Sequence, residues 1–182
     1  QHMPLAEKKS NIMDRIRFRR FALATAHRAE NVDDPVVLRN FVEAFEEAPI
    51  PVVYPIHPRS KKRLRQQGMW KLLSSAENVQ TLEPLGYFDF LVLMKNCEMI
   101  ITDSGGIQEE ATAPCIRKPV LVIRLSTERP EAIETGFAML AGVEGKQILE
   151  AVHGSLEARI TNISSPFGNG NASEIIASIV DR

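Results

Sequence analysis

The sequence has 182 residues, a length that suits one globular domain and lets a chain bury most of the surface that it exposes when unfolded. Hydrophobic residues make up 44% and charged residues 25%, which is ordinary for a soluble globular protein. The net charge of -1 gives no electrostatic reason to expect nucleic acid or a membrane surface as a partner. Basic residues do gather at Arg15–Arg20 and at Arg59–Arg65, and we interpret both runs as solvated helix faces. No stretch approaches the apolar length that spans a bilayer.

The chain starts with a polar, charged segment in which no signal peptide is visible. Residues 1–3 resemble an expression-vector remnant, and we assign residues 1–20 to this remnant and an interdomain segment. On this interpretation the natural sequence starts inside a larger protein. Cys97 and Cys115 are too few for a disulfide framework, and both have apolar neighbours. We therefore expect buried thiols in a reducing, cytoplasmic compartment.

Predicted strands and helices alternate along the chain. In chain order, the first half reads as strand Phe21–Ala26, polar loop His27–Asp34, helix Pro35–Glu47, strand Pro51–Ile56, a basic helix through Gly68, strand Val79–Leu82 and helix Phe88–Lys95. The second half reads as strand Met99–Thr102, helix Gly106–Ala113, strand Val120–Ile123, helix Pro130–Thr135, a weak strand Phe137–Leu140, and helices Lys146–His153 and Ala172–Val180. Asp34 before Pro35 is a good helix cap followed by a good first-turn residue.

This alternation predicts an α/β fold with a doubly wound parallel sheet. In such sheets ligands bind at the carboxyl ends of the strands, where the crossovers switch sides. The loops at those ends follow Ala26, Ile56, Leu82, Thr102 and Ile123. We therefore look for the chemistry of the protein in these loops.

The loop after the Met99–Thr102 strand has the strongest local pattern, TDSGGIQEE. Ser104, Gly105 and Gly106 would let the backbone come close to a ligand at the positive end of a helix dipole, which predicts a phosphate-binding seat. A tight strand-to-helix turn with a serine cap explains the same residues. The loop has neither GxGxxG nor the lysine of a P-loop, so it suggests neither dinucleotide nor ATP-type binding.

Glu109 and Glu110 follow one short turn into the same helix. Adjacent carboxylates on a helix point about 100° apart, so only one of the two can easily face a ligand. A carboxylate at this place would suit a ribose diol. The preference of helix N-termini for acidic residues is the alternative explanation.

Three further loops carry polar or aromatic groups. His27 and Arg28 sit at the carboxyl end of the first strand, where a ligand is expected, although a lone histidine is more often structural. Arg129 could contact a phosphate through two hydrogen bonds, or could pair with Glu128 or Glu131. The segment 84–90, PLGYFDF, offers backbone groups and aromatic rings suited to a flat base, or a helix packed by its aromatics.

Taken together these loops resemble the non-hydrolysing UDP-N-acetylglucosamine 2-epimerases. The matching pieces are TAHRAENVDDP, YPIHP, LEPLGYFDFLVLMKNC, TDSGGIQEEA, KPVLVIRLSTERPEA and SPFGNGNASEII. They occur in the family's order from about Phe21 to the end of the chain. TDSGGIQEE and TERPE are specific when they occur together.

The resemblance implies a two-domain fold of the GT-B type, with residues 21–182 as its carboxy-terminal, Rossmann-like half. It also assigns the site residues. Ser104, Gly105 and Gly106 would hold the diphosphate, and Glu110 would bind the ribose. The backbone around Leu85 and Phe90 would bind the uracil. Arg129 would lie on the phosphate side, Arg28 would be among the substrate-binding residues, and His27 would be the catalytic residue that faces the sugar-phosphate. It implies no metal and no cofactor.

In this family UDP is eliminated to leave a 2-acetamidoglucal intermediate and is added back with C2 inverted. The first domain supplies the carboxylates that move the C2 proton, and no segment here matches that domain. We therefore expect the chain alone to bind UDP or UDP-N-acetylglucosamine weakly and to be inactive. Its implied partners are the nucleotide sugar, the amino-terminal domain and a second copy in a homodimer, and its implied role is the synthesis of cell-envelope polysaccharides.

One segment departs from the family. Where the family usually reads LGKP, this chain has the longer Thr112–Pro119, with Arg117 at a position where glycine is common. The connection after the phosphate loop is therefore expected to be reshaped, at the far end of its helix. Two other functions stay open: a UDP-sugar binding or regulatory module without chemistry, and another GT-B enzyme, either a hydrolysing epimerase or a glycosyltransferase.

Overall fold

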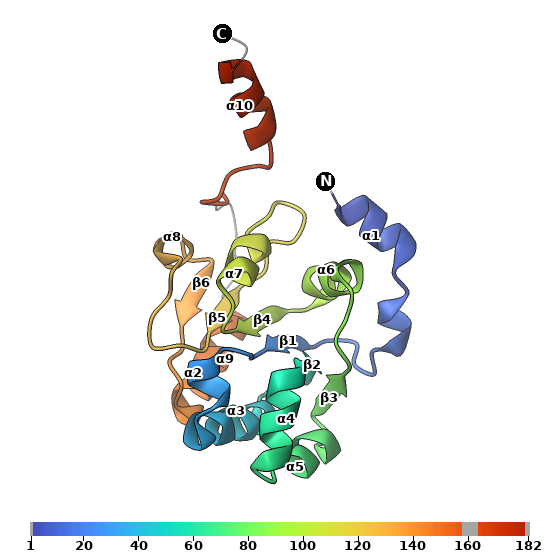
Figure 1. The fold of residues 1–182 in the computed structure, drawn as a ribbon, viewed down its shortest axis with the longest axis vertical. Helices are drawn as coiled ribbons and strands as arrows, with labels where there is room; N and C mark the ends of the chain where they lie inside the picture. The colour runs from blue at the N-terminus through green and yellow to red at the C-terminus, as the bar shows by residue number, and fades with distance from the viewer. Residues whose placement is uncertain (1, 158–163, 181–182) are drawn as a thin grey trace.

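The computed structural model describes residues 2–157 and 164–180 and is built on one sheet (Figure 1). The sheet has six strands in the order β3-β2-β1-β4-β5-β6, and every neighbouring pair is parallel. The strands are β1 (Ala22–Thr25), β2 (Val52–Pro55), β3 (Val79–Leu82), β4 (Met99–Thr102), β5 (Val120–Val122) and β6 (Ala138–Leu140). The doubly wound parallel sheet expected from the sequence is confirmed.

Helices fill the connections between the strands. Those before β3 are α1 (Met3–Lys9), the 3-10 helix η1 (Ile12–Arg15), α2 (Ala29–Val32), α3 (Pro35–Glu47), α4 (Pro58–Gln66) and α5 (Trp70–Ser75). Those after β3 are α6 (Tyr87–Asn96), α7 (Gly105–Ala111), α8 (Pro130–Glu134), α9 (Gly145–Glu157) and α10 (Ala172–Val180). The helices expected from the sequence are all present, whereas α1, α2 and α5 were not expected.

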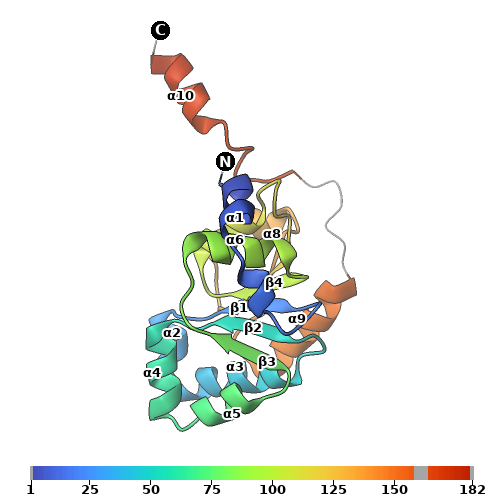
Figure 2. The same ribbon diagram turned by 90° about the vertical axis from the view of Figure 1, so that its right-hand side faces the viewer.

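The two faces of the sheet carry separate apolar cores, because successive strand residues point to opposite sides. Ala22 and Ala24 of β1 belong to the core that α3, α4, α5 and α9 cover, together with Phe41. Leu23 belongs to the opposite core, which includes Leu93 and is covered by α1, α6, α7 and α8. Figures 1 and 2 show these two helix layers below and above the sheet. With both faces covered, the inner strands are apolar along nearly their whole length, whereas β3, at the edge of the sheet, carries the half-buried Gln80 and Thr81.

The start of α3 follows the capping expected from the sequence. The Asp34 side chain accepts hydrogen bonds from the backbone N–H groups of Val36 at 2.8 Å and Val37 at 3.3 Å. Pro35 occupies the first turn, where its missing N–H leaves no bond unmade. The cap therefore fixes where the polar loop after β1 ends and α3 begins.

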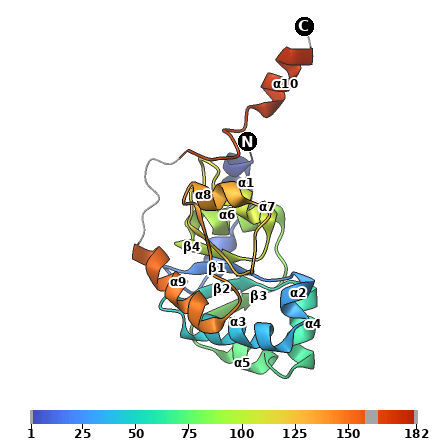
Figure 3. The same cartoon turned by 90° about the vertical axis from the view of Figure 1, so that its left-hand side faces the viewer.

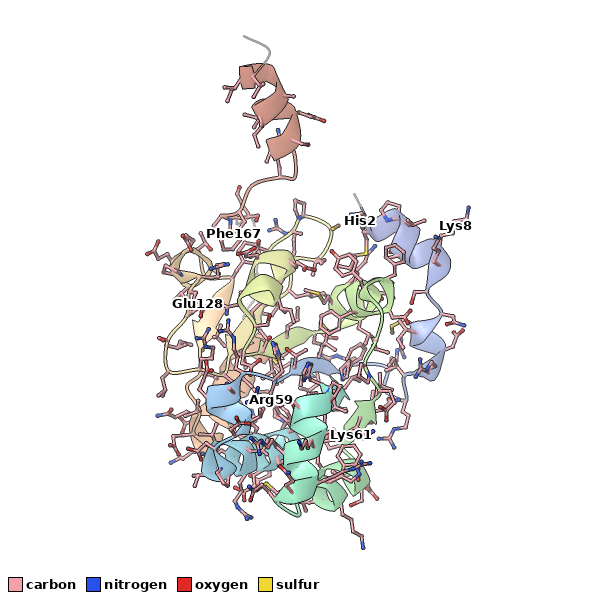
Figure 4. The ribbon with its side chains drawn as sticks, viewed as in Figure 1. His2, Lys8, Arg59, Lys61, Glu128 and Phe167 are labelled. Atoms are coloured by element: carbon pink, nitrogen blue, oxygen red, sulfur yellow. The ribbon has the colours of Figure 1, made fainter. Side chains whose placement is uncertain are left out.

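The amino-terminal segment is folded onto the domain. α1 lies beside α6 (Figure 2), and its Met3 and Ala6 are buried in the same core as Leu93. Lys8, on the other side of α1, points to solvent (Figure 4). The basic run 15–20 that follows is solvated but, beyond η1, not helical, so our interpretation of it as a helix face is wrong; the run 59–65 does lie on α4. The assignment of residues 1–20 to a vector remnant and an interdomain segment stays a prediction.

The last helix stands apart from the two layers, as Figure 3 shows. None of the residues of α10 is buried, and its Ile175, Ile176, Ile179 and Val180 are exposed. α10 therefore contributes to neither core. Among the residues that the structure describes, no helix is both long and apolar enough to cross a membrane.

Candidate functional site

A cavity of about 400 Å³ opens at the carboxyl ends of β1, β2 and β3. The strand order runs outward from β1 to β3 and restarts at β4 on the other side of β1, so the cavity lies at the switch point between β1 and β4, where doubly wound sheets bind ligands. It is lined by Thr25, His27, Pro55, Ile56, His57, Pro84, Leu85, Tyr87, Phe90, Ile107 and Glu110. Four of the predicted site residues, His27, Leu85, Phe90 and Glu110, are thus brought together from the loops and helices that follow β1, β3 and β4.

One wall of the cavity is apolar. Leu85 lies in the loop between β3 and α6, and Phe90 lies in the first turns of α6, both only partly buried. Ile107 of α7 lines the same cavity. A flat, mostly apolar ring such as a nucleobase fits a wall of this kind, and the volume lies in the usual range of small-ligand sites.

The two adjacent carboxylates of α7 point to different surroundings. Glu110 lines the cavity, and burial raises the pKa of its carboxyl group. Glu109 instead forms an ion pair with the guanidinium of Arg129. The divergence follows from the helical twist, which separates neighbouring side chains by about 100°. Only Glu110 is therefore placed to contact a ligand in the cavity.

The loop between β4 and α7 carries the predicted phosphate seat beside the cavity. The N–H of Ser104 donates to the Thr102 hydroxyl at 3.0 Å, and no bond from the Ser104 side chain caps α7. The serine-cap explanation of this loop is therefore not what the structure forms. A side chain at Gly106 would extend into open space, so neither packing nor backbone conformation requires glycine there. An open approach to the backbone is what a bound phosphate needs.

Three charged side chains stand in front of this loop. A Cβ atom placed on Gly105 would lie 3.3 Å from Glu128 Oε2 and 4.0 Å from Arg129 Cζ. Glu128, labelled in Figure 4, accepts hydrogen bonds from Arg28 at 3.0 and 3.3 Å. Arg28 and Arg129 thus lie at the predicted phosphate seat but are paired with carboxylates. Arg129 pairs with the carboxylate of Glu109 rather than with those of its sequence neighbours Glu128 and Glu131, although its Nη1 donates to the backbone carbonyl of Glu128 at 2.8 Å.

Asp103 is the residue that the sequence analysis missed. It is fully buried, and its Oδ2 accepts hydrogen bonds from the backbone N–H groups of His27 and Arg28, both at 2.8 Å. Its Oδ1 lies 3.2 Å from Nδ1 of His27. The signal that the sequence offered was position alone. Asp103 is the first residue after β4, at the carboxyl edge of the sheet where ligands bind, and a charge buried there must be stabilised by partners.

The pKa values of this pair move in opposite directions. The hydrogen bond to Asp103 raises the pKa of His27 above its ordinary value, although burial opposes it. Burial would raise the pKa of Asp103, but the hydrogen bonds from the His27 side chain and from the backbone N–H groups outweigh burial and lower it. The geometry thus favours an ionised Asp103 beside a histidine that binds a proton readily.

Comparison with known proteins places these loops in a family. A model of the UDP-N-acetylglucosamine 2-epimerase family matches residues 1–181. The chain belongs to this family. A UDP-N-acetylglucosamine 2-epimerase of Methanocaldococcus jannaschii is 41% identical over 99% of the chain and 50% of its own length. The chain therefore spans about half the length of the curated relatives that it matches.

Solved structures of the family agree with this fold. The crystal structure of the Methanocaldococcus jannaschii UDP-GlcNAc 2-epimerase in complex with UDP-GlcNAc and UDP superposes with a TM-score of 0.86 at 38% identity, over 100% of this chain and 51% of that one. A Pseudomonas aeruginosa relative, 39% identical over 86% of this chain and 43% of its own length, is a UDP-2,3-diacetamido-2,3-dideoxy-D-glucuronate 2-epimerase. The family thus includes members named for more than one UDP-sugar.

The segment that we expected to depart from the family, Thr112–Pro119, contains one residue with an unusual backbone conformation. Arg117 has a φ of 49°, in the left-handed region that disfavours any residue with a Cβ atom. Its guanidinium lies 5.8 Å from the centre of the Phe137 ring. The turn follows α7 at the end away from Gly105. Position 117, where the resemblance led us to expect glycine, is therefore one where glycine would relieve backbone strain.

The cysteines differ in exposure. Cys97 is buried, and burial raises the pKa of its thiol to about 12. Cys115 is exposed. Our expectation of two buried thiols is wrong for Cys115, because its apolar sequence neighbours belong to a turn on the surface rather than to a strand or a helix.

Proposed function

We propose that this chain is the UDP-binding half of a two-domain enzyme that interconverts UDP-N-acetylglucosamine and UDP-N-acetylmannosamine. The observation that carries the proposal is the cavity at the sheet's switch point, with an apolar wall, one carboxylate and the open β4–α7 loop at its rim. Uracil would lie on the apolar wall near Leu85 and Phe90. The ribose hydroxyls would donate to Glu110. The diphosphate would reach the backbone of Ser104, Gly105 and Gly106, with Arg28 and Arg129 turning from their carboxylate partners toward it.

The proposed reaction is an elimination followed by an addition. A base removes the C2 proton, the C1–C2 double bond forms, and the C1–O bond breaks with its electron pair going to the β-phosphate oxygen of UDP. The reverse addition delivers a proton to the opposite face of C2. Amides, arginines and a protonated His27 at the phosphate would stabilise the charge that develops on departing UDP. The bases at C2 would come from the amino-terminal domain, which would bind the other side of the nucleotide sugar.

The division of labour predicts how the chain behaves alone. The chain alone offers the ligand contacts from only one domain, whereas the entropic cost of immobilising the ligand is paid in full. Binding should therefore be weak. Calorimetry should therefore detect weak UDP binding to this chain, and CDP should bind less well if the backbone near Leu85 reads uracil. Proton NMR should detect no epimerisation by the chain and conversion by the parent protein.

Each measurement decides a different part of the proposal. If no uridine nucleotide binds to the folded chain, the assignment of the cavity is wrong. If the chain alone converts UDP-N-acetylglucosamine, the chemistry does not need a second domain. If the parent protein binds the nucleotide sugar but converts none, the protein is a binding module. If the parent prefers a UDP-diacetamido-glucuronate, the sugar assignment fails while the UDP site stands.

A further inference from the structure

Asp103 is a buried carboxylate that holds the loop carrying His27. Its Oδ2 accepts three hydrogen bonds, from the N–H groups of His27 and Arg28 at 2.8 Å each and from Nδ2 of Asn31 at 3.3 Å. Asn31 also donates to the Ile123 carbonyl at 3.1 Å, which anchors it to the end of β5. A single carboxylate oxygen thus fixes the position of the first residues of the β1–α2 connection. Burial of a charge on this scale is stable only because its partners are in place.

The other oxygen of Asp103 faces the histidine ring. Oδ1 lies 3.2 Å from Nδ1 of His27, and within residues 2–157 and 164–180 it accepts no well-aligned hydrogen bond from any other group, so this contact is the one polar approach to it. An ionised carboxylate only accepts hydrogen bonds, so its position beside Nδ1 favours the tautomer that carries the proton on Nδ1. The cavity that His27 lines is then left to Nε2. Neutral His27 presents a bare Nε2 there, and protonated His27 presents an N–H.

We propose that Asp103 is a positioning residue that fixes His27 with Nδ1 protonated and Nε2 turned to the cavity, so that His27 can donate an Nε2 proton to a phosphate oxygen of the bound nucleotide sugar. The ligand role rests on the proposed function. The control of the histidine ring does not, because it depends only on contacts within this chain.

The charged and titratable groups that face His27 support this role. They are Asp103, Arg28, Glu30 and, with ring centres 5.6 Å apart, His57. Nδ1 of His57 accepts a hydrogen bond from the N–H of Arg59 at 3.1 Å, so this nitrogen carries no proton. The hydrogen bond to Asp103 is the largest influence and raises the pKa of His27, against the opposing effects of burial and of Arg28.

Asp103 also joins the histidine loop to the phosphate loop. It directly precedes Ser104, whose N–H is held by the Thr102 hydroxyl, and Thr102 in turn lies 2.7 Å from the Thr25 hydroxyl of β1. Hydrogen bonds therefore join the two loops on both sides of the carboxylate. The position of His27 and that of Ser104–Gly106 are set by the same buried network.

The test is Asp103→Asn, which keeps the shape of the side chain. Its carbonyl oxygen can still accept from the backbone N–H groups, which turns the NH₂ group toward Nδ1 of His27. Long-range proton–nitrogen NMR of the chain should then show a switch from the Nδ1–H to the Nε2–H tautomer. The pKa of His27 should fall, with about tenfold weaker proton binding. Asp33→Asn, which removes the ion pairs of a surface carboxylate with Arg59 and Arg63, should change neither property.

The wild-type chain provides a check that does not depend on folding of the variant. If neutral His27 in the wild-type chain carries its proton on Nε2, the proposal is overturned whether or not Asp103→Asn folds. An unchanged tautomer in a folded Asp103→Asn overturns it as well.

The ligand role is read from the pH dependence of UDP-N-acetylglucosamine binding. This ligand suits the test because its diphosphate is esterified at both ends, whereas a terminal phosphate titrates near pH 6 itself. Affinity should fall as pH rises through the pKa of His27, and in Asp103→Asn this step should move to lower pH. If the tautomer switches but wild-type affinity shows no step, Asp103 positions His27 and the proposed ligand role of His27 fails. If the chain binds no UDP-N-acetylglucosamine while the tautomer switches, the proposed function fails and the positioning stands.

Discussion

Replacing Glu110 by glutamine tests which residue reads the ribose. Glu110 is half-buried in the cavity lining, and a carboxylate that accepts from two ribose hydroxyls forms two charge-assisted hydrogen bonds. Each such bond contributes about 1.5–3 kcal/mol when shielded from water. Because the cavity is open on one side, we reduce this to about 1–2 kcal/mol for the pair, which corresponds to about a tenfold loss of affinity. Calorimetric titration of Glu110→Gln with UDP should show this loss.

The nucleotide analogue and the neighbouring residue supply the controls. 2′,3′-Dideoxy-UDP lacks the hydroxyls, so its affinity should hardly differ between wild type and Glu110→Gln. Glu109→Gln removes a carboxylate that pairs with Arg129 outside the cavity, so any change it causes should be equal for the two nucleotides. Equal losses for UDP and the dideoxy analogue in Glu110→Gln would refute the reasoning, because the lost contact would then not involve the ribose.

Three further predictions concern the folded chain. Arg117→Gly should raise the free energy of unfolding in urea by about 0.5–1 kcal/mol, because relief of the left-handed strain exceeds the entropy of the added glycine, and Arg117→Ala, which keeps the strain, should show no gain. Stability should decline at both ends of a pH series. Because the pKa of Asp103 is lowered, its contribution to the free energy of unfolding is lost as pH falls below the pKa of an unfolded aspartate. Because the pKa of His27 is raised, its contribution is lost as pH rises through the folded-state pKa of His27. Asp103→Asn should therefore flatten both limbs of urea-derived stability curves. A thiol reagent should label Cys115 in the native chain and Cys97 only after unfolding, and rapid native labelling of both would contradict the buried position of Cys97.

Local sequence patterns were sufficient to predict the sheet. The strands Val79–Leu82 and Met99–Thr102 have the predicted bounds. Met99–Thr102 is covered on both faces and is a short, almost entirely apolar run, which is visible in the sequence. Val79–Leu82 lies at the edge of the sheet and keeps apolar, buried residues at its two ends. The site loops were predicted for the same reason, since the carboxyl edge of the sheet follows directly from where each run ends. The cap of α3 by Asp34 depends only on neighbouring residues, and it too was predicted.

What could not be predicted depends on distant contacts. Met3 and Ala6 look like part of a polar tail until α6 provides the surface that buries them. Arg129 has acidic neighbours on both sides in the sequence, yet it pairs with Glu109 of α7. In the sequence Asp103 resembles any loop aspartate. It becomes a buried hydrogen-bond acceptor only because the β1–α2 loop packs beside it in the folded chain.

The strand order also has a consequence for how the chain folds. β1 is central, and its partner on one side is β4, so that Thr25 and Thr102 form a hydrogen bond across 77 positions of sequence. Synthesis at about 5–20 residues per second would leave that edge of β1 without its partner for roughly 4–15 s. Pairing between distant parallel strands is also slow for entropic reasons. The edge of β1 that later meets β4 is therefore the part of the nascent chain where we expect a chaperone to bind.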